Sequence, residues 1–394
     1  MNILVISSQY PPINKANLYT ENMALHYTAR QWVKMGHKVF AFPLFLQAEA
    51  FPDTYSNDTF SKKIFETVAD NVSLFIKDFK RNPSNGLVKK SAIKKAAKQY
   101  RKLLKTLPKI DLAIVHSPSS TYDLADYLKL TCPKVAVFDT NDCKKLSVPK
   151  FARYHKMYDA FGYTLDSVKN KIESVTEIKK PTFVTRSQVP NFIMPERFDR
   201  QWKDDVIRLV FAGEFAPYKN IDVIINALAK VKDRSKFHLD LIGAGAMEPA
   251  LRRLIVNNNM TETVTFYNSM FKSELLSKFR TSDVFVMASS HLSFGLSYLE
   301  AMSQGCIPLC VEDERIDGII QNGVNGYILK AKDVDALAKK LDDIAELSAS
   351  KLSVISEAAV ETASNLTEEK TATRYIEEVL ANVSKLEPAS INKK

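Results

Sequence analysis

Residues 288–309 (ASSHLSFGLSYLEAMSQGCIPL) combine a strand end, a turn with a glycine and the start of a helix. A helix start of this kind offers free backbone N–H groups and the positive end of the helix dipole, which suit a diphosphate. Glu300 would lie about one turn inside the helix, where its carboxylate could accept hydrogen bonds from ribose hydroxyls. For Glu300 taken alone a surface salt bridge is the simpler interpretation. The segment is therefore a candidate nucleotide site only if its surroundings agree.

The glycines are few and unevenly placed. The chain has 11 glycines in 394 residues, which is well below the norm of about 7%. Eight of the 11 lie between residues 213 and 326, so a close approach of backbone to a ligand is to be sought there. None precedes residue 36. This excludes a glycine-rich phosphate-binding loop after the first expected strand.

The four cysteines, Cys132, Cys143, Cys306 and Cys310, show neither CxxC spacing nor a neighbouring pair of histidines. We therefore expect buried free thiols in a reducing compartment rather than a zinc site or a disulfide framework. The first residues, MNILVISSQYPP, are typical of a strand and not of a signal peptide. Because no stretch approaches the ~18 apolar residues of a spanning helix, we expect a cytoplasmic protein that is not integral to a membrane.

The net charge of +10 comes mainly from residues 77–109, which contain twelve basic residues and one acid, Asp78. The rest of the chain is close to neutral. Nucleic-acid-binding proteins more often spread their basic residues over a whole domain face, with aromatic residues between them. We therefore expect no nucleic-acid partner.

Within this basic segment the pattern predicts an amphipathic helix over residues 86–107. Its apolar residues recur at helical spacing, and they are Ile93, Ala97, Tyr100, Leu104 and Leu107. Lysines and arginines occupy the remaining faces. Such a helix could rest on an anionic membrane surface. It could equally be a solvated surface helix whose apolar side packs on its own domain, and the sequence leaves both interpretations open.

The hydrophobic pattern of the first half predicts an α/β domain. The expected strands cover residues 2–7, 38–43, 72–76, 111–116, 134–138, 160–163 and 182–185, and a helix is expected over residues 18–35. Short apolar runs separated by helices imply a parallel sheet that is covered on both faces.

The second half repeats this pattern with better definition. Strands are expected over residues 206–213, 237–243, 263–267, 283–289 and 307–311, and helices over residues 219–231, 247–257, 272–280, 294–304 and 332–345. The polar residues 193–205 are the expected linker. The predicted fold class is α/β, with two Rossmann-like doubly wound domains facing across a cleft, over residues 1–192 and 206–365. A C-terminal helix over residues 366–386 is expected to cross back to the first domain.

Five stretches of the second expected domain resemble the family 4 glycosyltransferases, which are retaining enzymes with the two-domain GT-B fold. In order they are FAGEFAPYKNIDVIINAL, LDLIGAGAMEPALRRL, VTFYNSMFKSELLSKFRTSDVFVMASS, FGLSYLEAMSQGCIPL and GIIQNGVNGYIL. They follow the family's order and spacing over residues 206–345. VPN at residues 189–191 and GHKV at residues 36–39 extend the resemblance more weakly to the whole chain.

The resemblance implies roles for five residues. Lys219 matches the lysine that neutralises the donor diphosphate, and Gly295 and Leu296 match backbone donors of the same site. Glu300 matches the second glutamate of the family's paired motif, the one that binds ribose. His116 matches the catalytic histidine that faces the donor sugar, although a histidine that caps a strand end would look the same. The first domain would hold the acceptor and the second the donor.

The sequence departs from the family pattern around the donor site. Leu292 stands where the first glutamate of the pair is found, and Glu214 replaces the usual arginine near Lys219. Residues 14–17 (NKAN) replace a glycine pair after the first strand, and Gly318 occupies a position that is usually acidic.

The leading hypothesis is a retaining glycosyltransferase that moves a sugar from a UDP- or GDP-sugar to a glycan or lipid-linked acceptor, in cell-surface polysaccharide assembly. We expect no cofactor and no metal, because Lys219 and a helix N-terminus can supply the positive field. The alternative is a degenerate pseudo-enzyme that acts as the partner subunit of another glycosyltransferase, and Leu292 and Glu214 motivate it. A dehydrogenase is disfavoured because no GxGxxG follows a strand.

Overall fold

The computed structural model describes residues 1–8, 10, 23–45, 64–78, 90–117, 124–145, 148–186, 188–195, 202, 206–289, 296–312 and 318–384. The chain divides into two compact units. The N-terminal unit comprises Met1–Arg186 and Glu368–Lys394, and the C-terminal unit comprises Ser187–Thr367. Each unit is described by itself.

The N-terminal unit is built on an eight-stranded sheet with the order β3-β4-β2-β1-β5-β6-β7-β8. Its strands are β1 (Asn2–Ser7), β2 (Lys38–Phe45), β3 (Phe65–Ala69), β4 (Val72–Asp78), β5 (Leu112–His116), β6 (Lys134–Phe138), β7 (Ala160–Tyr163) and β8 (Thr182–Val184). All neighbours are parallel except β3 and β4. The expected parallel sheet is confirmed, with an antiparallel edge strand that the pattern did not predict.

That edge strand arises from a tight hairpin. Asp70 and Asn71 are the only two residues between β3 and β4, and both have positive φ, 49° and 62°. Two-residue hairpin loops with positive φ at both positions favour Asp and Asn, because these residues tolerate the left-handed region. The Asp-Asn pair was therefore the sequence signal for β3.

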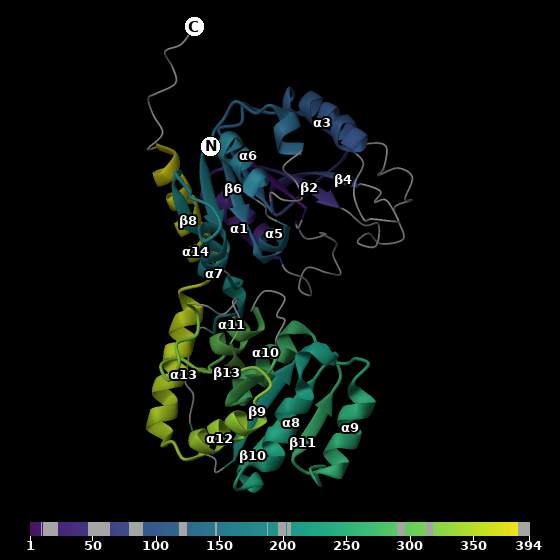
Figure 1. Ribbon diagram of the computed structural model, residues 1–394, viewed down its shortest axis with the longest axis vertical. Coiled ribbons are helices and arrows are strands. Elements are labelled where there is room, and N and C mark those ends of the chain that lie inside the picture. Colours follow the sequence, from purple (N-terminus) through teal and green to yellow (C-terminus); the bar gives the residue numbers. More distant parts are fainter. Residues whose placement is uncertain are drawn as a thin grey trace. The chain divides into compact units, whose positions relative to one another are not determined.

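Helices cover both faces of this sheet (Figure 1). They are α1 (Ala24–Lys34), α3 (Lys90–Leu104), α5 (Thr140–Lys145), α6 (Val148–Met157), α7 (Asp166–Glu173) and α14 (Glu368–Ser384). Alternate residues of β1 enter different hydrophobic clusters: Leu4 and Ile6 pack with α3, α6 and α7, whereas Ile3 and Val5 pack with α1 and α14. Strands that are buried on both faces must be apolar throughout, which is why β1 shows no alternation in its sequence.

The C-terminal helix α14 is part of the N-terminal unit, where it lies against β8 and α1 (Figure 1). Tyr375 is buried in the cluster that also contains Trp32. Trp32 Nε1 donates a hydrogen bond to the backbone oxygen of Ala372 at 3.0 Å. Arg30 forms two hydrogen bonds with the carboxylate of Glu368, at 2.6 and 2.7 Å. The expected return of this helix to the first domain is confirmed.

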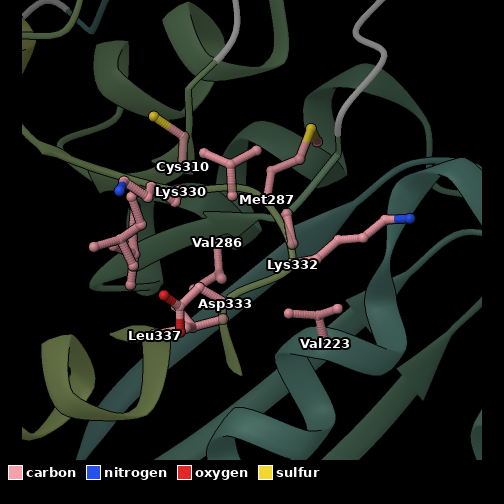
Figure 2. Close-up of a pocket in the computed structure, with 12 residues that line it drawn as sticks. Val223, Val286, Met287, Cys310, Lys330, Lys332, Asp333 and Leu337 are labelled. Atoms are coloured by element: carbon pink, nitrogen blue, oxygen red, sulfur yellow. The ribbon is translucent and has the colours of Figure 1, made fainter. Parts of the chain in front are cut away.

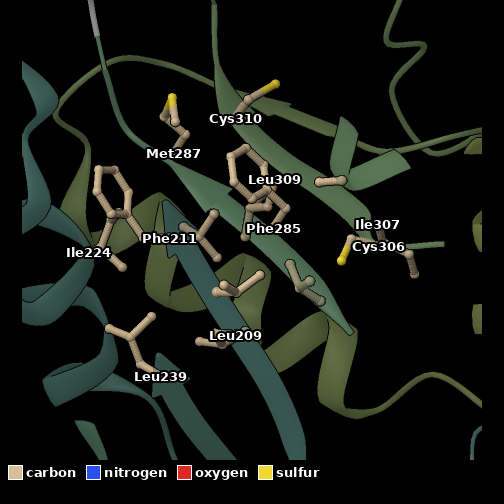
Figure 3. Close-up of a cluster of buried hydrophobic side chains, with 14 of the residues drawn as sticks. Leu209, Phe211, Ile224, Leu239, Phe285, Met287, Cys306, Ile307, Leu309 and Cys310 are labelled. Carbon is tan, nitrogen blue, oxygen red and sulfur yellow. The ribbon is translucent and has the colours of Figure 1, made fainter. Parts of the chain in front are cut away.

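The C-terminal unit has a six-stranded parallel sheet with the order β11-β10-β9-β12-β13-β14. Its strands are β9 (Ile207–Ala212), β10 (Phe237–Ile242), β11 (Val264–Tyr267), β12 (Val284–Met287), β13 (Ile307–Val311) and β14 (Tyr327–Leu329). Leu209, Phe211, Phe285 and Leu309 project from neighbouring strands into one buried cluster (Figure 3). The short edge strand β14 was not predicted, because its three residues are only half-buried.

The helices of the C-terminal unit are α8 (Ile221–Lys230), α9 (Glu248–Asn257), α10 (Lys272–Thr281), α11 (Leu296–Ser303), α12 (Val334–Ala345) and α13 (Ala349–Ser364). The boundary between the units falls at residues 186–187 rather than at the expected linker, residues 193–205. Val189 and Ile193 are buried in the core of the C-terminal unit, and this packing explains the earlier boundary. Among the described residues no helix is both long and apolar enough to cross a membrane.

Candidate nucleotide-binding site

A cavity of about 450 Å³ lies at the carboxyl ends of β9 and β10 in the C-terminal unit. Open α/β sheets bind their ligands at this edge. The cavity is lined by residues 212–214 after β9, residues 242–244 after β10, Ser269 and Met270 after β11, Leu275 and Phe279 of α10, and Ser297 of α11. Its wall thus combines backbone, the carboxylate of Glu214, two hydroxyl side chains and apolar side chains.

Two glycines allow the backbones that line this cavity to meet. Gly243 has a φ of 145°, and a Cβ atom at this position would overlap the carbonyl oxygen of Gly213. The backbone N–H of Phe215 also donates to the carbonyl oxygen of Ala244 at 2.9 Å. Two of the eight clustered glycines therefore bring the loops after β9 and β10 together at the cavity.

Lys219 ends a short 3-10 turn, Pro217–Lys219, on the loop after β9. Asn220 follows in the left-handed region with a φ of 49°, and its side-chain amide donates to the carbonyl oxygen of Ala288 at 2.7 Å. Ser289 Oγ donates to the carbonyl oxygen of Tyr218 at 3.3 Å. The loop is therefore fastened to the end of β12. Lys219 is 9% exposed, and its Nζ lies 5.3 Å from the centroid of the Tyr218 ring.

Glu214 lines the cavity and accepts a hydrogen bond from the Tyr218 hydroxyl at 2.8 Å. This hydrogen bond is the main cause of the raised pKa of Tyr218. An acid at this position would repel a diphosphate unless it were paired or turned away. The structure shows that Glu214 is paired with a neutral hydroxyl, so its negative charge remains at the cavity.

Glu300 lies on α11, one turn after the cavity residue Ser297. Its Oε1 is 2.6 Å from Nζ of Lys272, the first residue of α10. The salt bridge that is the simpler interpretation of Glu300 is thus present. Leu296 is the first residue of α11 and is half-buried, whereas Gly295 and Leu292 lie outside the described residues.

His116 ends β5 in the N-terminal unit and contacts the last helix of that unit. Its Nε2 is 2.9 Å from the Tyr375 hydroxyl, and the two rings meet edge to face. Burial lowers the pKa of His116 to about 3. The imidazole is therefore neutral at physiological pH, where one ring nitrogen can donate and the other can accept a hydrogen bond.

The structure brings some of the predicted residues together. Leu296 and Glu300 lie on one helix beside the cavity, and Lys219 lies on the loop that also carries the cavity residue Glu214. Neither Lys219 nor Glu300 lines the cavity itself. His116 lies in the other unit.

Sequence reasoning missed the cavity residues Ser269, Met270 and Ser297, and the ion-pair partner Lys272. All four fall within stretches that carry the resemblance, and Ser269 and Met270 follow β11 after one intervening residue. Their position after the carboxyl end of a parallel strand could have identified Ser269 and Met270 as candidate ligand-binding residues.

A second hollow lies at the ends of β12, β13 and β14, between α8 and α12 (Figure 2). It is lined mainly by apolar side chains, among them Val223, Met287 and Leu337, and the ammonium groups of Lys330 and Lys332 extend away from it on opposite sides (Figure 2). Its volume of about 10 Å³ is at the lower limit for a single water molecule. The larger cavity is therefore the candidate ligand site.

Comparisons with known proteins match the C-terminal unit to glycosyltransferases. Residues 193–362 match the family described as glycosyl transferases group 1. An uncharacterised glycosyltransferase of Methanocaldococcus jannaschii is 28% identical over 142 residues, which are 36% of each chain. A D-inositol 3-phosphate glycosyltransferase of Streptomyces scabiei is 28% identical over 152 residues, which are 36% of this chain and 34% of the relative. The matches span about a third of the length of these relatives.

Solved structures resemble the chain over nearly its whole length. A glycosyltransferase of Rickettsia africae has a TM-score of 0.70 at 15% identity, covering 97% of this chain and 98% of that structure. HepE of Anabaena, in complex with UDP and glucose, has a TM-score of 0.64 at 14% identity, covering 97% and 99%. The chain therefore has the GT-B fold of these glycosyltransferases, and its C-terminal unit matches the group 1 glycosyl transferase family.

Proposed function

We propose that this protein is a retaining glycosyltransferase that takes its sugar from a nucleotide-sugar donor bound in the C-terminal unit. The observation that carries the proposal is the 450 Å³ cavity at the carboxyl ends of β9 and β10, whose lining includes Ser297 of α11, the helix that also carries Leu296 and Glu300. The cavity lies within the residues that match the group 1 family. The complex of the structurally similar HepE with UDP and glucose agrees with a nucleoside diphosphate as the ligand.

The residues around the cavity suit the departure of a nucleoside diphosphate. When the bond between the anomeric carbon and the β-phosphate breaks, negative charge develops on the phosphate oxygens. The ammonium group of Lys219 and the N–H groups at the start of α11 would stabilise that charge. The acceptor hydroxyl would form its bond to the same face of the anomeric carbon and give its proton to the leaving phosphate. This route needs neither a covalent nucleophile nor a metal ion.

His116 would face the donor sugar as a neutral hydrogen-bonding group. Burial lowers its pKa to about 3, which favours hydrogen bonding by the neutral ring over proton donation by an imidazolium at neutral pH. Its contact with Tyr375 fixes the ring at the end of β5. In this proposal His116 orients a sugar hydroxyl and transfers no proton.

Isothermal titration with UDP, GDP and their sugar conjugates tests the proposal directly. We expect at least one nucleotide to bind and its sugar conjugate to be consumed when an acceptor is present. Retention is read from the anomeric configuration of the product by NMR spectroscopy. Inversion of that configuration would contradict the retaining mechanism.

One observation favours a second function, that of a catalytically inactive partner of another glycosyltransferase. Glu214 keeps a carboxylate on the cavity wall, where it opposes a diphosphate. If no UDP- or GDP-linked donor binds in the titration, the partner function becomes the better proposal.

The acceptor side of the proposal is a glycan or lipid-linked saccharide in cell-surface polysaccharide assembly, with the enzyme resting on the inner face of the cell membrane. Helix α3 supports this location. Its charged residues Lys94, Lys95 and Lys98 are exposed, whereas Ala97 and Tyr100 are buried in the core. The Tyr100 hydroxyl also donates to the carbonyl oxygen of Phe75 at 2.9 Å. Because the apolar side is already packed, the helix would bind a membrane by charge alone.

A further inference from the structure

The ion pair between Lys272 and Glu300 joins the start of α10 to the middle of α11. Lys272 Nζ is 2.6 Å from Glu300 Oε1, and the two side chains are 23% and 13% exposed. Within the described residues no second hydrogen bond to the Glu300 carboxylate is present, so Oε2 remains open to a ligand. The pair therefore fixes one oxygen of the carboxylate and leaves the other available.

Both members of the pair lie one turn from a residue that lines the cavity. Leu275 follows Lys272 by three positions on α10, and Ser297 precedes Glu300 by three positions on α11. Residues three apart on a helix share a face. We therefore place the pair at the border of the cavity, one helical turn from its lining.

The structure does not need this pair to hold α10 in place. The same helix carries Lys278, whose Nζ is 2.8 Å from the buried Asp240 and 3.1 Å from the Tyr267 hydroxyl. Phe279 of α10 is fully buried in the core. What the Lys272 pair does provide is a fixed orientation of the Glu300 side chain.

We propose that Lys272 is a positioning residue that orients Glu300. The Glu300 carboxylate can then accept hydrogen bonds from the ribose hydroxyls of the bound nucleotide. The inference rests on the proposed function, because it takes the cavity ligand to be a nucleoside diphosphate. A carboxylate has lone pairs enough to accept from the ammonium group and from a ribose diol together. A site built to hydrogen-bond a hydroxyl rejects the analogue that lacks it, because its polar group is then left unpaired. Lys272 thus makes the site selective for ribonucleotides over 2′-deoxyribonucleotides.

The test measures affinities for UDP and 2′-deoxy-UDP, and for GDP and 2′-deoxy-GDP, by isothermal titration with the full chain. We expect the wild-type protein to bind the ribonucleotide at least about tenfold more tightly than its deoxy analogue. Lys272→Met should reduce this ratio to about one to three, chiefly by weakening the ribonucleotide. Lys272→Arg keeps the charge and should restore most of the ratio.

Lys278→Met is the matched control, since it breaks an ion pair on the same helix at a position turned toward Asp240. We expect it to lower the melting temperature and leave the ribose to deoxyribose ratio unchanged. An unchanged affinity ratio in Lys272→Met would overturn this inference but not the proposed function. An equal loss of the ratio in Lys272→Met and Lys278→Met would also overturn it, because the effect would then come from α10 as a whole. Failure of every nucleotide to bind the wild-type protein would overturn the proposed function as well.

Discussion

Glu300 and Lys219 are the two charged residues that we assign to the donor. Glu300→Gln and Lys219→Ala should each weaken nucleotide binding without unfolding the protein. The loss of one charge-assisted hydrogen bond costs on the order of 1.5–3 kcal/mol, or roughly ten- to a hundredfold in affinity. Titration of each variant gives the affinity and a melting curve gives the stability. Unchanged turnover and donor affinity in both variants would refute the site assignment.

The charge of Lys219 also bears on metal dependence. If this ammonium group and the start of α11 neutralise the leaving diphosphate, the reaction rate should be unchanged by excess EDTA. The measurement is the initial rate with and without chelator. A rate that EDTA abolishes and manganese restores would contradict the assignment of the positive field to the protein.

His116 should make the stability of the N-terminal unit depend on pH. Burial lowers its pKa to about 3 in the folded protein, whereas the unfolded chain has a pKa near ~6.5. Below ~6.5 the unfolded state binds a proton that the folded state does not, so stability falls as the pH drops, by roughly 1 kcal/mol per pH unit.

Urea midpoints at pH 7.5, 6 and 5 measure this effect when the wild-type protein is compared with His116→Gln, which does not titrate. His26 has a pKa that burial lowers too, but it titrates in both proteins and cancels in the difference. Parallel pH profiles for the two proteins would show that His116 has no such effect.

For single residues, the sequence predicts which residues belong to the candidate site better than it predicts which side chains they contact. The motif order predicts roles for Lys219 and Glu300; Lys219 lies on the loop that also carries the lining residue Glu214, and Glu300 lies one turn from the lining residue Ser297. The partner of His116 is 259 residues away in the sequence, and that of Glu300 is 28 away. Such contacts depend on how elements pack, which a motif does not encode. Tyr218 and Glu214 are only four residues apart, so their hydrogen bond could have been predicted from the local sequence.

Among the elements, α3 carries a prediction of its own. Each basic residue near an anionic surface contributes about 1 kcal/mol, falling off within a Debye length of ~8 Å. The exposed Lys94, Lys95, Lys98 and Lys102 lie on the solvent side of α3. Changing all four to Glu should release the protein from anionic vesicles in a co-sedimentation assay.

The same four changes should leave nucleotide affinity intact, because the cavity lies in the C-terminal unit. Binding of the wild-type protein should fall steeply with salt, since the apolar side of α3 is packed on its own unit. Equal wild-type binding to neutral and anionic vesicles, or none to either at low salt, would leave α3 an ordinary solvated helix.

The elements of the sheets were largely predictable, because strands buried on both faces form continuous apolar runs. The expected strands over residues 2–7, 134–138, 160–163 and 307–311 have the observed bounds. The hydrophobic pattern did not predict strands β3 and β14, because both are edge strands with half-buried or exposed residues. Their pairing comes from a neighbouring strand rather than from their own hydrophobicity.

For the molecule as a whole, the N-terminal unit should depend on its last helix. Removal of residues 368–394 takes away the partners of Arg30, Trp32 and His116 together. We expect this truncation to abolish the thermal unfolding transition of the N-terminal unit while that of the C-terminal unit survives. Scanning calorimetry measures both transitions, with Arg374→Ala on the exposed side of α14 as the control. Two undiminished transitions after truncation would contradict this dependence.

The return of α14 also has a consequence for how the protein is made. The C-terminal unit is one uninterrupted stretch of chain, but the N-terminal unit lacks α14 until Glu368–Ser384 have been synthesised, after the whole C-terminal unit. At about 5–20 residues per second, the ribosome needs roughly 10–40 seconds to travel from residue 186 to residue 368. During that time the sheet face around Trp32 has no helix α14 to cover it. The half that is synthesised first is therefore completed last, and its bare apolar face is the part of the nascent chain that a chaperone would have to shield.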